Sequence, residues 1–459
     1  MTFEEASGKY SLMDCVQLTA AKFQAARPTF QVDEQPAFPK LLDKARNNTF
    51  SYPLRRLILD VSDLLRRSNL TGIGRVELEL VRQFVALAKI TGDAVLLAGF
   101  NGKFYQEYTL VDMEIMAPTY GLKTTGAPIN FTHGDQFLLV WAILSKPEEF
   151  FTAVYQARRA GAAITFMVHD LIPIANTLMD NEGFIRSFFI GWSQILRFAD
   201  RLVTVSRKVS RDVACYVAET SMAGLVPTRP LPVAYFALGC DALQRSRKVE
   251  VSLAHPVDRN TLVAAGTLAK HKRITELVTA MQILWAEGCE MRLLLPGDDV
   301  GNGKIRAYLS SLPDIGSKLI LPGYISDAEL AETMSRCGAL VCASSDEGFG
   351  LPLVEAANLG CPVIARDIEI FRETSGGEAF FFENGDAGKI AEGLRKWFAL
   401  TRQQQLTFVP KKSLVTWQQS AEMLKAIMFN DAASFSVDVG LKATVNLAVP
   451  KATQETLNP

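Results

Sequence analysis

Short apolar runs alternate with longer amphipathic stretches along most of the chain. RLILDV (56–61) and AVLLAG (94–99) are strand-like, and apolar residues four positions apart between them indicate one face of a helix. Further strand-like runs follow at 137–141, 162–168, 201–205 and 232–238. Continuous apolar strands separated by helices are typical of a parallel sheet that helices cover on both faces. The pattern therefore predicts a doubly wound α/β domain over residues 56–250.

A second series of the same kind begins at residue 261. Its strand-like runs are TLVAAG, MRLLLPGD, KLILPGY, ALVCAS, CPVIARD and AFFFEN, with helical stretches between several of them. Ser326 and Glu329 form a capping-box pattern that marks the start of one helix. This series predicts a second doubly wound domain over residues 251–410. The join between the two domains is expected within the polar segment 242–258.

Both ends of the chain lie outside this alternation. Residues 1–55 are expected to form an N-terminal extension. Residues 431–459 are low in charge and rich in small side chains, so we expect a loosely packed tail there. The predicted organisation is two α/β domains between an extension and a tail.

Composition and charge narrow the class of protein. The chain has 459 residues, of which 48% are hydrophobic and 21% charged, an ordinary globular composition. Its 48 basic and 49 acidic residues give a net charge of −1, which excludes a broadly basic surface for nucleic acid. No secretory signal opens the sequence, and no stretch approaches the ~18 apolar residues of a spanning helix. Seven scattered cysteines form no CxxC pair, so a soluble cytoplasmic protein with reduced thiols is expected.

The segment SSDEGFGLPLVEAANLGCPVIARD carries the clearest candidate chemistry. Gly348 and Gly350 follow a strand and precede a helix that begins near Pro352, so the backbone can turn sharply and present N–H groups. A helix N-terminus approached by such a loop binds phosphate. Glu347 and Glu355 flank the turn, and their carboxylates can accept hydrogen bonds from the hydroxyls of a ribose and a sugar. The alternative is an ordinary strand-to-helix turn with a solvated acid at each end.

A cluster of basic side chains follows the first strand of the second series. In AAGTLAKHKRITELV, positions 270–273 are Lys, His, Lys and Arg at the start of a helix. Such a cluster can stabilise a pyrophosphate leaving group, where negative charge develops in the transition state. The alternative is a basic helix start on a solvated surface.

Two further candidates lie in the first domain. In TGIGRVELELV, Gly72 and Gly74 form a strand-to-helix loop, but Glu77 occupies the third glycine position of a dinucleotide fingerprint, which disfavours an NAD-dependent enzyme. In FMVHDLIPI, His169 and Asp170 follow an apolar strand, where ligands gather in open α/β sheets. A satisfied structural histidine is the alternative reading of His169.

Metal-binding patterns are lacking in the sequence. No two of the four histidines have the spacing of metal ligands, and no acidic pair of the DxD type ends a strand. We therefore expect no divalent metal and no other cofactor.

Several of these segments resemble the retaining glycosyltransferases of family 4. EGFGLPLVEA is similar to the paired-glutamate motif of that family, GCPVIARD to the turn and strand that follow it, and GYISDAEL to the element before it. HDLIP resembles a motif of family members that build bacterial polysaccharides. TWQQSAEML resembles the closing helix that crosses back to the first domain, expected over 411–430. The resemblance covers roughly residues 56–428 and implies the GT-B architecture, in which two Rossmann-like domains face each other across a cleft.

The resemblance also implies roles for the matching residues of the donor site. Glu355 would hold the ribose hydroxyls of the nucleotide, and Glu347 would hold hydroxyls of the donor sugar. Lys272 would stabilise the leaving phosphates, although His271 and Thr267 stand where relatives carry arginine. The whole donor-binding set is Gly72, Gly74, Gly266, Lys272, Glu347, Gly348, Phe349, Gly350, Leu351 and Glu355.

In the first domain, His169 would lie near the anomeric carbon of the donor sugar and stabilise it during reaction. This role places His169 with Glu347 and Lys272 among the expected catalytic residues. Asp170 and Arg75 would contact the acceptor. For Arg75, a solvated charge at a helix start is an equal alternative.

The implied activity is retaining, metal-independent transfer of a hexose from a GDP- or UDP-linked sugar. Mannose is the first candidate for the sugar, and a polysaccharide or lipid-linked oligosaccharide is the expected acceptor. Such an acceptor implies peripheral contact with the inner face of the plasma membrane. Two other classes stay open: a sugar-nucleotide-binding protein without catalysis, and a GT-B epimerase or phosphorylase.

Overall fold

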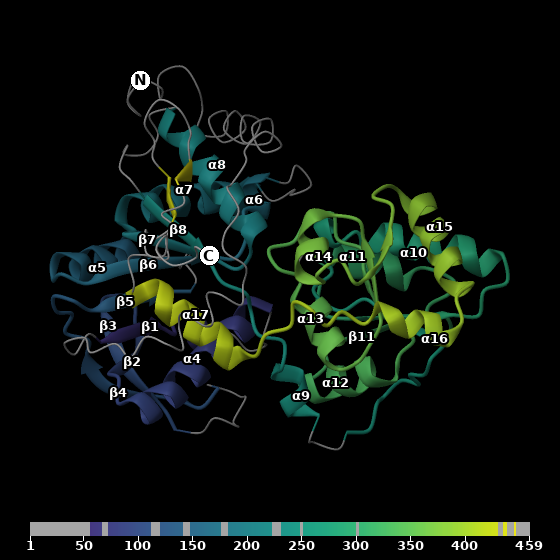
Figure 1. Cartoon of the computed structure of the whole chain (residues 1–459), viewed down its shortest axis with the longest axis horizontal. Coiled ribbons are helices and arrows are strands. Elements are labelled where there is room, and N and C mark those ends of the chain that lie inside the picture. Colours follow the sequence, from purple (N-terminus) through teal and green to yellow (C-terminus); the bar gives the residue numbers. More distant parts are fainter. Residues whose placement is uncertain are drawn as a thin grey trace, which may run out of the picture. The chain divides into compact units, whose positions relative to one another are not determined.

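The computed structural model describes residues 56–66, 72–111, 120–140, 147–175, 182–222, 231–247, 251–299, 303–429, 435–437 and 445–446. The chain divides into two compact units (Figure 1). Unit 1 comprises residues 1–236 and 418–459, and unit 2 comprises residues 237–417. The chain therefore leaves unit 1, builds unit 2 from one continuous stretch, and returns to unit 1.

A ten-stranded mixed sheet forms the centre of unit 1, in the order β16-β15-β8-β7-β6-β5-β1-β2-β3-β4. Neighbouring strands from β8 to β2 are parallel, and the strands outside them pair antiparallel. The strands are β1 (Leu57–Asp60), β2 (Val95–Phe100), β3 (Tyr105–Leu110), β4 (Leu122–Pro128), β5 (Gln136–Leu139), β6 (Ala163–Val168), β7 (Arg201–Thr204), β8 (Leu231–Tyr235), β15 (Phe435–Val437) and β16 (Val445–Asn446). β1, β5 and β7 are buried along their whole length, which explains their continuous apolar sequences.

Helices connect and cover these strands. They are the 3₁₀ turn η2 (Leu64–Arg66), α4 (Gly72–Thr91), α5 (Pro147–Arg159), α6 (Ile172–Ala175), α7 (Glu182–Phe198), α8 (Arg207–Met222) and α17 (Trp417–Phe429). Ser206 caps α8 by accepting a hydrogen bond from the Val209 N–H at 3.1 Å. The Arg201 guanidinium donates to the Met428 carbonyl at 2.9 Å. This bond ties α17 to β7 and so joins the returning end of the chain to unit 1.

Unit 2 is built on a six-stranded parallel sheet in the order β11-β10-β9-β12-β13-β14. Its strands are β9 (Thr261–Val263), β10 (Arg292–Pro296), β11 (Leu319–Gly323), β12 (Ala339–Cys342), β13 (Val363–Arg366) and β14 (Phe380–Phe382). Its helices are α9 (Ala242–Ser246), η3 (Lys270–Lys272), α10 (Ile274–Ala286), α11 (Lys304–Ser310), α12 (Asp327–Arg336), α13 (Leu351–Asn358), α14 (Glu369–Thr374), α15 (Ala387–Phe398), α16 (Arg402–Gln405) and η4 (Leu406–Phe408). Buried side chains of α10, α15 and the strands form one apolar core. The predicted capping box of Ser326 and Glu329 is present at the start of α12.

The strands expected from the apolar runs are all present, but two edges of the first sheet were not foreseen. β3 and β4 form an antiparallel hairpin beside β2, and β4 is exposed along most of its length. A polar, half-exposed hairpin has no continuous apolar run to reveal it. Residues 435–437 and 445–446, expected within a loose tail, pair beside β8 instead.

The division between the units falls at residue 236, before the segment 242–258 where the join was expected. The reason is that α9 packs against α12 and α13 and so belongs to unit 2. The outgoing and returning segments also pair: the Cys240 N–H donates to the Val415 carbonyl at 2.9 Å, and the Trp417 N–H to Asp241 Oδ1 at 2.7 Å. Gly239 is required here, because a Cβ on it would lie 2.4 Å from Trp417 Cγ.

Candidate functional site

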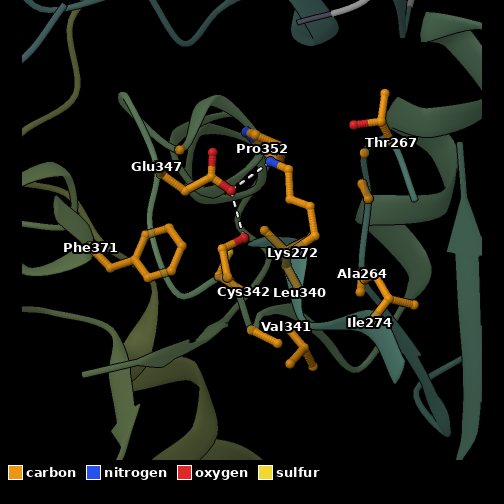
Figure 2. Close-up of a pocket in the computed structure, with 15 residues that line it drawn as sticks. Ala264, Thr267, Lys272, Ile274, Leu340, Val341, Cys342, Glu347, Pro352 and Phe371 are labelled. Atoms are coloured by element: carbon orange, nitrogen blue, oxygen red, sulfur yellow. Dashed lines mark hydrogen bonds and ion pairs between the residues drawn. The ribbon is translucent and has the colours of Figure 1, made fainter. Parts of the chain in front are cut away.

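A pocket lies at the carboxyl ends of β9 and β12 in unit 2 (Figure 2). β9 leads through α10 to β10 on one side, whereas β12 leads through α13 to β13 on the other. The pocket therefore occupies the topological switch point of the sheet, where open α/β sheets bind ligands. Its polar lining includes Thr267, Lys272, Ser344 and Glu347.

The basic turn after β9 forms one wall of this pocket. Gly266 has a φ of +131°, and a side chain on Gly297 would lie 1.9 Å from the Gly266 carbonyl oxygen, so both positions require glycine. Lys272 ends the short helix η3, and its Nζ lies 3.9 Å from the position of a Cβ on Gly266. Arg273 follows in the left-handed region with a φ of 54°, and its guanidinium pairs with Glu276 at 2.5 Å. The turn thus directs Lys272 to the pocket and Arg273 to α10.

The turn after β12 forms the opposite wall and carries Glu347. The Lys272 ammonium donates to Glu347 Oε1 at 2.5 Å, and the Ser344 hydroxyl donates to the same oxygen at 2.6 Å (Figure 2). The backbones of the two walls are joined as well, because the Ser345 N–H donates to the His271 carbonyl at 2.8 Å. The site is therefore held together both by side chains and by main chain.

Charge and burial set the protonation of this site. Burial acts to raise the pKa of Glu347, but the positive charge of Lys272 and the hydrogen bonds to Lys272 and Ser344 outweigh it, and the pKa lies below its ordinary value. Burial, together with the Lys272 charge, lowers the pKa of His271 to about 4. At neutral pH the site thus holds an ionised Glu347 beside Lys272 and a neutral His271.

The start of α13 also lines the pocket, through Gly350 and Pro352. Gly350 has a φ of +83°, and a side chain on it would meet the Phe371 ring at 3.0 Å. α13 begins at Leu351, one residue before the expected Pro352. The Leu353 N–H, in the first turn of α13, donates to the Gly350 carbonyl at 2.9 Å. This bond forms because the first turn of the helix is already closed at Gly350.

The donor-binding residues expected in this unit are only partly gathered in the pocket. Gly266, Lys272, Glu347 and Gly350 line it. Gly348, Phe349 and Leu351 are buried, and the side chain of Glu355 on α13 is fully buried. Glu355 lies close enough to Cys240 to contribute, with burial as the main cause, to a pKa of about 12 for that thiol.

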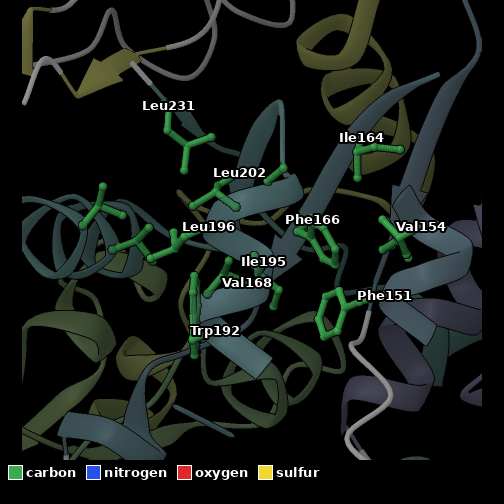
Figure 3. Packing of buried hydrophobic residues seen from close by; sticks show 14 of the residues in the cluster. Phe151, Val154, Ile164, Phe166, Val168, Trp192, Ile195, Leu196, Leu202 and Leu231 are labelled. Atoms are coloured by element: carbon green, nitrogen blue, oxygen red, sulfur yellow. The ribbon is translucent and has the colours of Figure 1, made fainter. Parts of the chain in front are cut away.

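In unit 1, His169 and Asp170 follow β6, whose Phe166 and Val168 belong to the apolar core (Figure 3). His169 is buried, and its Nε2 lies 3.1 Å from the carbonyl oxygen of Val140, just after β5. Asp170 Oδ1 accepts a hydrogen bond from the Ile172 N–H at 3.0 Å and so holds the start of α6. The two residues therefore lie at the carboxyl edge of the sheet, as expected.

The prediction of a glycine-rich loop in unit 1 is wrong, because these residues are helical. Gly72 and Gly74 lie within the first turn of α4, and Arg75 follows in the same helix, half-buried. α4 begins earlier than expected because Val76, Leu80 and Phe84 continue an apolar stripe that is buried against the sheet. The glycines are thus part of a helix N-terminus.

Three features of the two units were missed in the sequence. Ser344 and Ser345 were not assigned roles, although their place directly after an apolar strand was a usable signal. Asp60 at the end of β1 is buried, and burial raises its pKa to about 7, while Ser62 donates hydrogen bonds to it. Arg366 is a buried arginine whose contacts depend on strand order, so the sequence held no signal for it.

Among the described residues, no three or more His, Cys, Asp and Glu side chains form a group that could hold a metal ion.

Known proteins resemble both the second unit and the longer chain. Residues 246–407 match the family model described as glycosyl transferases group 1. The serotype-specific mannosyltransferase WbdA of Escherichia coli is 30% identical over 386 residues, which cover 82% of this chain and 45% of WbdA. The O-antigen chain mannosyltransferase RfbU of Salmonella typhimurium is 25% identical over 224 residues, covering 48% of this chain and 60% of RfbU. This chain spans about half the length of the WbdA proteins that it matches.

Solved structures support the fold. The pneumococcal O-GlcNAc transferase GtfA, solved with UDP and GlcNAc, aligns with a TM-score of 0.52 at 12% identity, covering 82% of this chain and 99% of that one. The catalytic domain of starch synthase IV from Arabidopsis thaliana, bound to ADP and acarbose, aligns with a TM-score of 0.51 at 10% identity and the same coverage. Among the described helices, none combines the length and apolar character that a membrane span requires. The fold is the expected GT-B class, with two parallel-sheet domains.

Proposed function

Residues 246–407 of this chain form a group 1 glycosyltransferase domain, and from that premise we propose that the chain transfers a mannosyl group from a nucleotide sugar to a saccharide acceptor. The two relatives described above are named as mannosyltransferases, one of them for the O-antigen chain. GDP-mannose is therefore the first donor to test, and a growing polysaccharide or lipid-linked oligosaccharide is the first acceptor class. A lipid-linked acceptor would bring the protein to a membrane surface.

One observation carries the proposal: the Lys272–Glu347 pair in the switch-point pocket, within the segment that matches the family. A cation beside a helix N-terminus suits a diphosphate, and a carboxylate beside them suits sugar hydroxyls. The two side chains keep 18% and 12% of their surface exposed, so a ligand can reach them. A solvated turn with unrelated charges would not bring the Lys272 ammonium and the Glu347 carboxylate together in one pocket.

The proposed reaction proceeds with retention of configuration at the anomeric carbon. The bond between that carbon and the diphosphate oxygen breaks, and the bond to the acceptor oxygen forms on the same face. The departing diphosphate takes the proton of the acceptor hydroxyl, so no separate base is needed. Lys272 stabilises the negative charge that accumulates on the diphosphate, and Glu347 orients the sugar through its hydroxyls.

The neutral His271 leaves Lys272 as the cation of this pocket lining, among the described residues. Backbone N–H groups at the start of α13 add the positive end of the helix dipole. We propose that these groups replace a metal ion in neutralising the diphosphate. His169 is proposed to stabilise the reacting sugar, and Asp170 and Arg75 to bind the acceptor. Glu355 is proposed to bind the ribose once a nucleotide rearranges its buried surroundings.

The experiment is a screen of GDP-, UDP-, ADP- and dTDP-sugars for turnover, with and without EDTA. Transfer in EDTA and an unchanged anomeric configuration by ¹H NMR would support the metal-independent, retaining reaction. Glu347→Ala and Lys272→Met should each lower turnover about 100-fold or more. Lys389→Met is the matched control, because Lys389 pairs with Glu383 at 2.7 Å on the exposed surface of α15. Near-normal turnover in both pocket variants would refute the assignment of the site.

The alternative classes give different results in the same screen. A binding protein without catalysis would bind a nucleotide sugar in titration calorimetry and leave it intact. A phosphorylase would consume inorganic phosphate, and an epimerase would convert the donor without an acceptor. The Lys272–Glu347 geometry and the named relatives favour transfer over these outcomes.

A further inference from the structure

Arg366, at the last position of β13, is an arginine almost completely enclosed by protein, with 2% of its surface exposed. No ion pair among the described residues includes it, and the nitrogen Nη2 is buried without a hydrogen-bond partner there. Burial is the main cause of a pKa below the ordinary arginine value, with the charge of Arg273 adding to it. Burying a charge without a counter-charge costs stability, so this arginine is a poor choice if packing alone mattered.

The contacts that Arg366 does make join three segments of the chain. Its Nε donates to the Ala343 carbonyl at 2.7 Å, and its Nη1 donates to Asn384 Oδ1 at 3.0 Å and to the Gly385 carbonyl at 2.7 Å. The guanidinium also lies over the Phe382 ring, 5.4 Å from its centroid. The planar, forked guanidinium can reach these acceptors at once, and a lysine ammonium cannot.

The segment held through Ala343 is the one that carries the sugar-binding glutamate. Ala343 follows β12 directly, and Ser344 comes next and donates to Glu347 Oε1 at 2.6 Å. Further along the same turn, Ser345 is bonded to the His271 carbonyl. Arg366 therefore fixes the start of a turn whose later residues meet Lys272.

We propose that Arg366 is a positioning residue: by holding the Ala343 carbonyl, it keeps the Ser344–Glu347 turn in register with Lys272. This inference rests on the proposed transferase function, because it assigns Arg366 to the same donor site. Arg366 itself does not line the pocket and acts through Glu347. A misplaced catalytic group costs up to about 100-fold in rate when it moves by about 1 Å.

The test compares Arg366→Lys and Arg366→Met with the wild type. Arg366→Lys keeps the charge but loses the three-point contact, and Arg366→Met keeps an apolar side chain of similar length without the charge. Both should lower kcat/KM for the nucleotide sugar by about 10- to 100-fold. Binding of the free nucleoside diphosphate, which lacks the sugar, should change less than about twofold in calorimetry. Arg372→Lys is the control, because Arg372 also stacks on a phenylalanine of β14 but lies on the surface, paired with Asp367.

A double variant separates positioning from general stability. Ser344→Ala removes the hydrogen bond from Ser344 to Glu347, through which Arg366 is proposed to act. The double variant Arg366→Lys with Ser344→Ala should therefore lose little more activity than either single variant. Additive losses, or a fall in nucleotide affinity parallel to the fall in kcat, would show a merely structural role and overturn the inference. Wild-type kcat in both Arg366 variants would overturn it as well.

A readout independent of activity keeps the two proposals distinguishable. The pKa of the Glu347 carboxyl group can be followed by NMR in protein labelled with ¹³C at glutamate, and the Glu347→Gln variant identifies its signal. In Arg366→Lys this pKa should be higher than in wild type, because the carboxylate moves away from Lys272. An unchanged titration would overturn the positioning role whether or not the protein is a transferase. Failure of the wild type to consume any nucleotide sugar would instead defeat the proposed function, and the Glu347 titration would still decide the role of Arg366.

Discussion

Replacing Lys272 by methionine tests the charge at the centre of the site while keeping the length of the side chain. The Lys272 ammonium lies 2.5 Å from Glu347 Oε1, and the two side chains are only 18% and 12% exposed. Breaking a buried ion pair by removing one partner costs about 3–5 kcal/mol, and the residual exposure here favours the lower end, about 3 kcal/mol. For a domain of the size of unit 2, that loss lowers Tm by about 6–12 °C.

The loss of stability should depend on pH in a definite direction. In the wild type, Lys272 holds the pKa of Glu347 in the folded protein below its value in the unfolded chain. The pair therefore stabilises the fold at a pH above the unfolded-state pKa, and this stabilisation is lost as the pH falls through the folded-state pKa. In Lys272→Met, the hydrogen bond from Ser344 remains, but burial is the largest influence on Glu347 and raises its pKa, so the unpaired carboxylate destabilises the fold at neutral pH. Protonation relieves this cost, and the difference in Tm between wild type and variant should narrow as pH falls from 7 to about 4.

Activity separates from stability in a double variant. Lys272→Met should lower kcat by about 100- to 1000-fold, because the leaving diphosphate loses its cation. Adding Glu347→Gln removes the unpaired charge and should restore most of the Tm without restoring turnover. Calorimetry and a donor-consumption assay measure the two quantities. Turnover of the single variant near that of wild type, or recovery of turnover in the double variant, would refute the reasoning.

Three further changes probe the surroundings of the pair. His271→Arg should tighten binding of a nucleoside diphosphate about fivefold, because it adds a fixed charge where a neutral imidazole with a pKa of about 4 now lies. Unchanged affinity in titration calorimetry would show that the guanidinium does not reach the phosphates. Gly350→Ala should lower the free energy of unfolding by about 1–2 kcal/mol, since its φ is +83° and the new Cβ would meet Phe371 at 3.0 Å; an unchanged urea midpoint would contradict this. Glu355→Gln should weaken binding of a nucleoside diphosphate about tenfold and leave pyrophosphate binding unchanged, and equal effects on both ligands would argue against a ribose contact.

The fold could be predicted from the sequence where the strands are buried on both faces of the sheet. Parallel strands covered on both faces are continuous apolar runs, so both sheets could be predicted from the pattern of apolar residues. The β3–β4 hairpin could not, because β4 is exposed along most of its length and has no continuous apolar run. The boundary of unit 2 was missed because α9 is too short to show a period, and its membership depends on contacts with α12 and α13.

The candidate site was predictable in its parts and not in its assembly. Lys272 and Glu347 each stood in a recognisable segment, yet their ion pair exists because β9 and β12 are neighbours, and strand order is not written in the local sequence. The absence of an arginine at 271 was visible, whereas the neutrality of His271 follows from burial beside Lys272. In the sequence, Arg366 is one more basic residue at the end of a strand, and only its buried contacts with Ala343 and Gly385 indicate a role.

The most direct test of the central claim is consumption of GDP-mannose by the purified chain in the presence of a polyprenyl-diphosphate-linked saccharide. The measured quantity is the mannose that appears on the acceptor, compared between wild type and Lys272→Met. We predict transfer by the wild type, one GDP released for each mannose transferred, and a loss of about 100-fold or more in the variant. If no sugar from a GDP, UDP, ADP or dTDP donor is transferred while nucleotide still binds, the chain is a sugar-nucleotide-binding protein and the proposed transferase function is wrong.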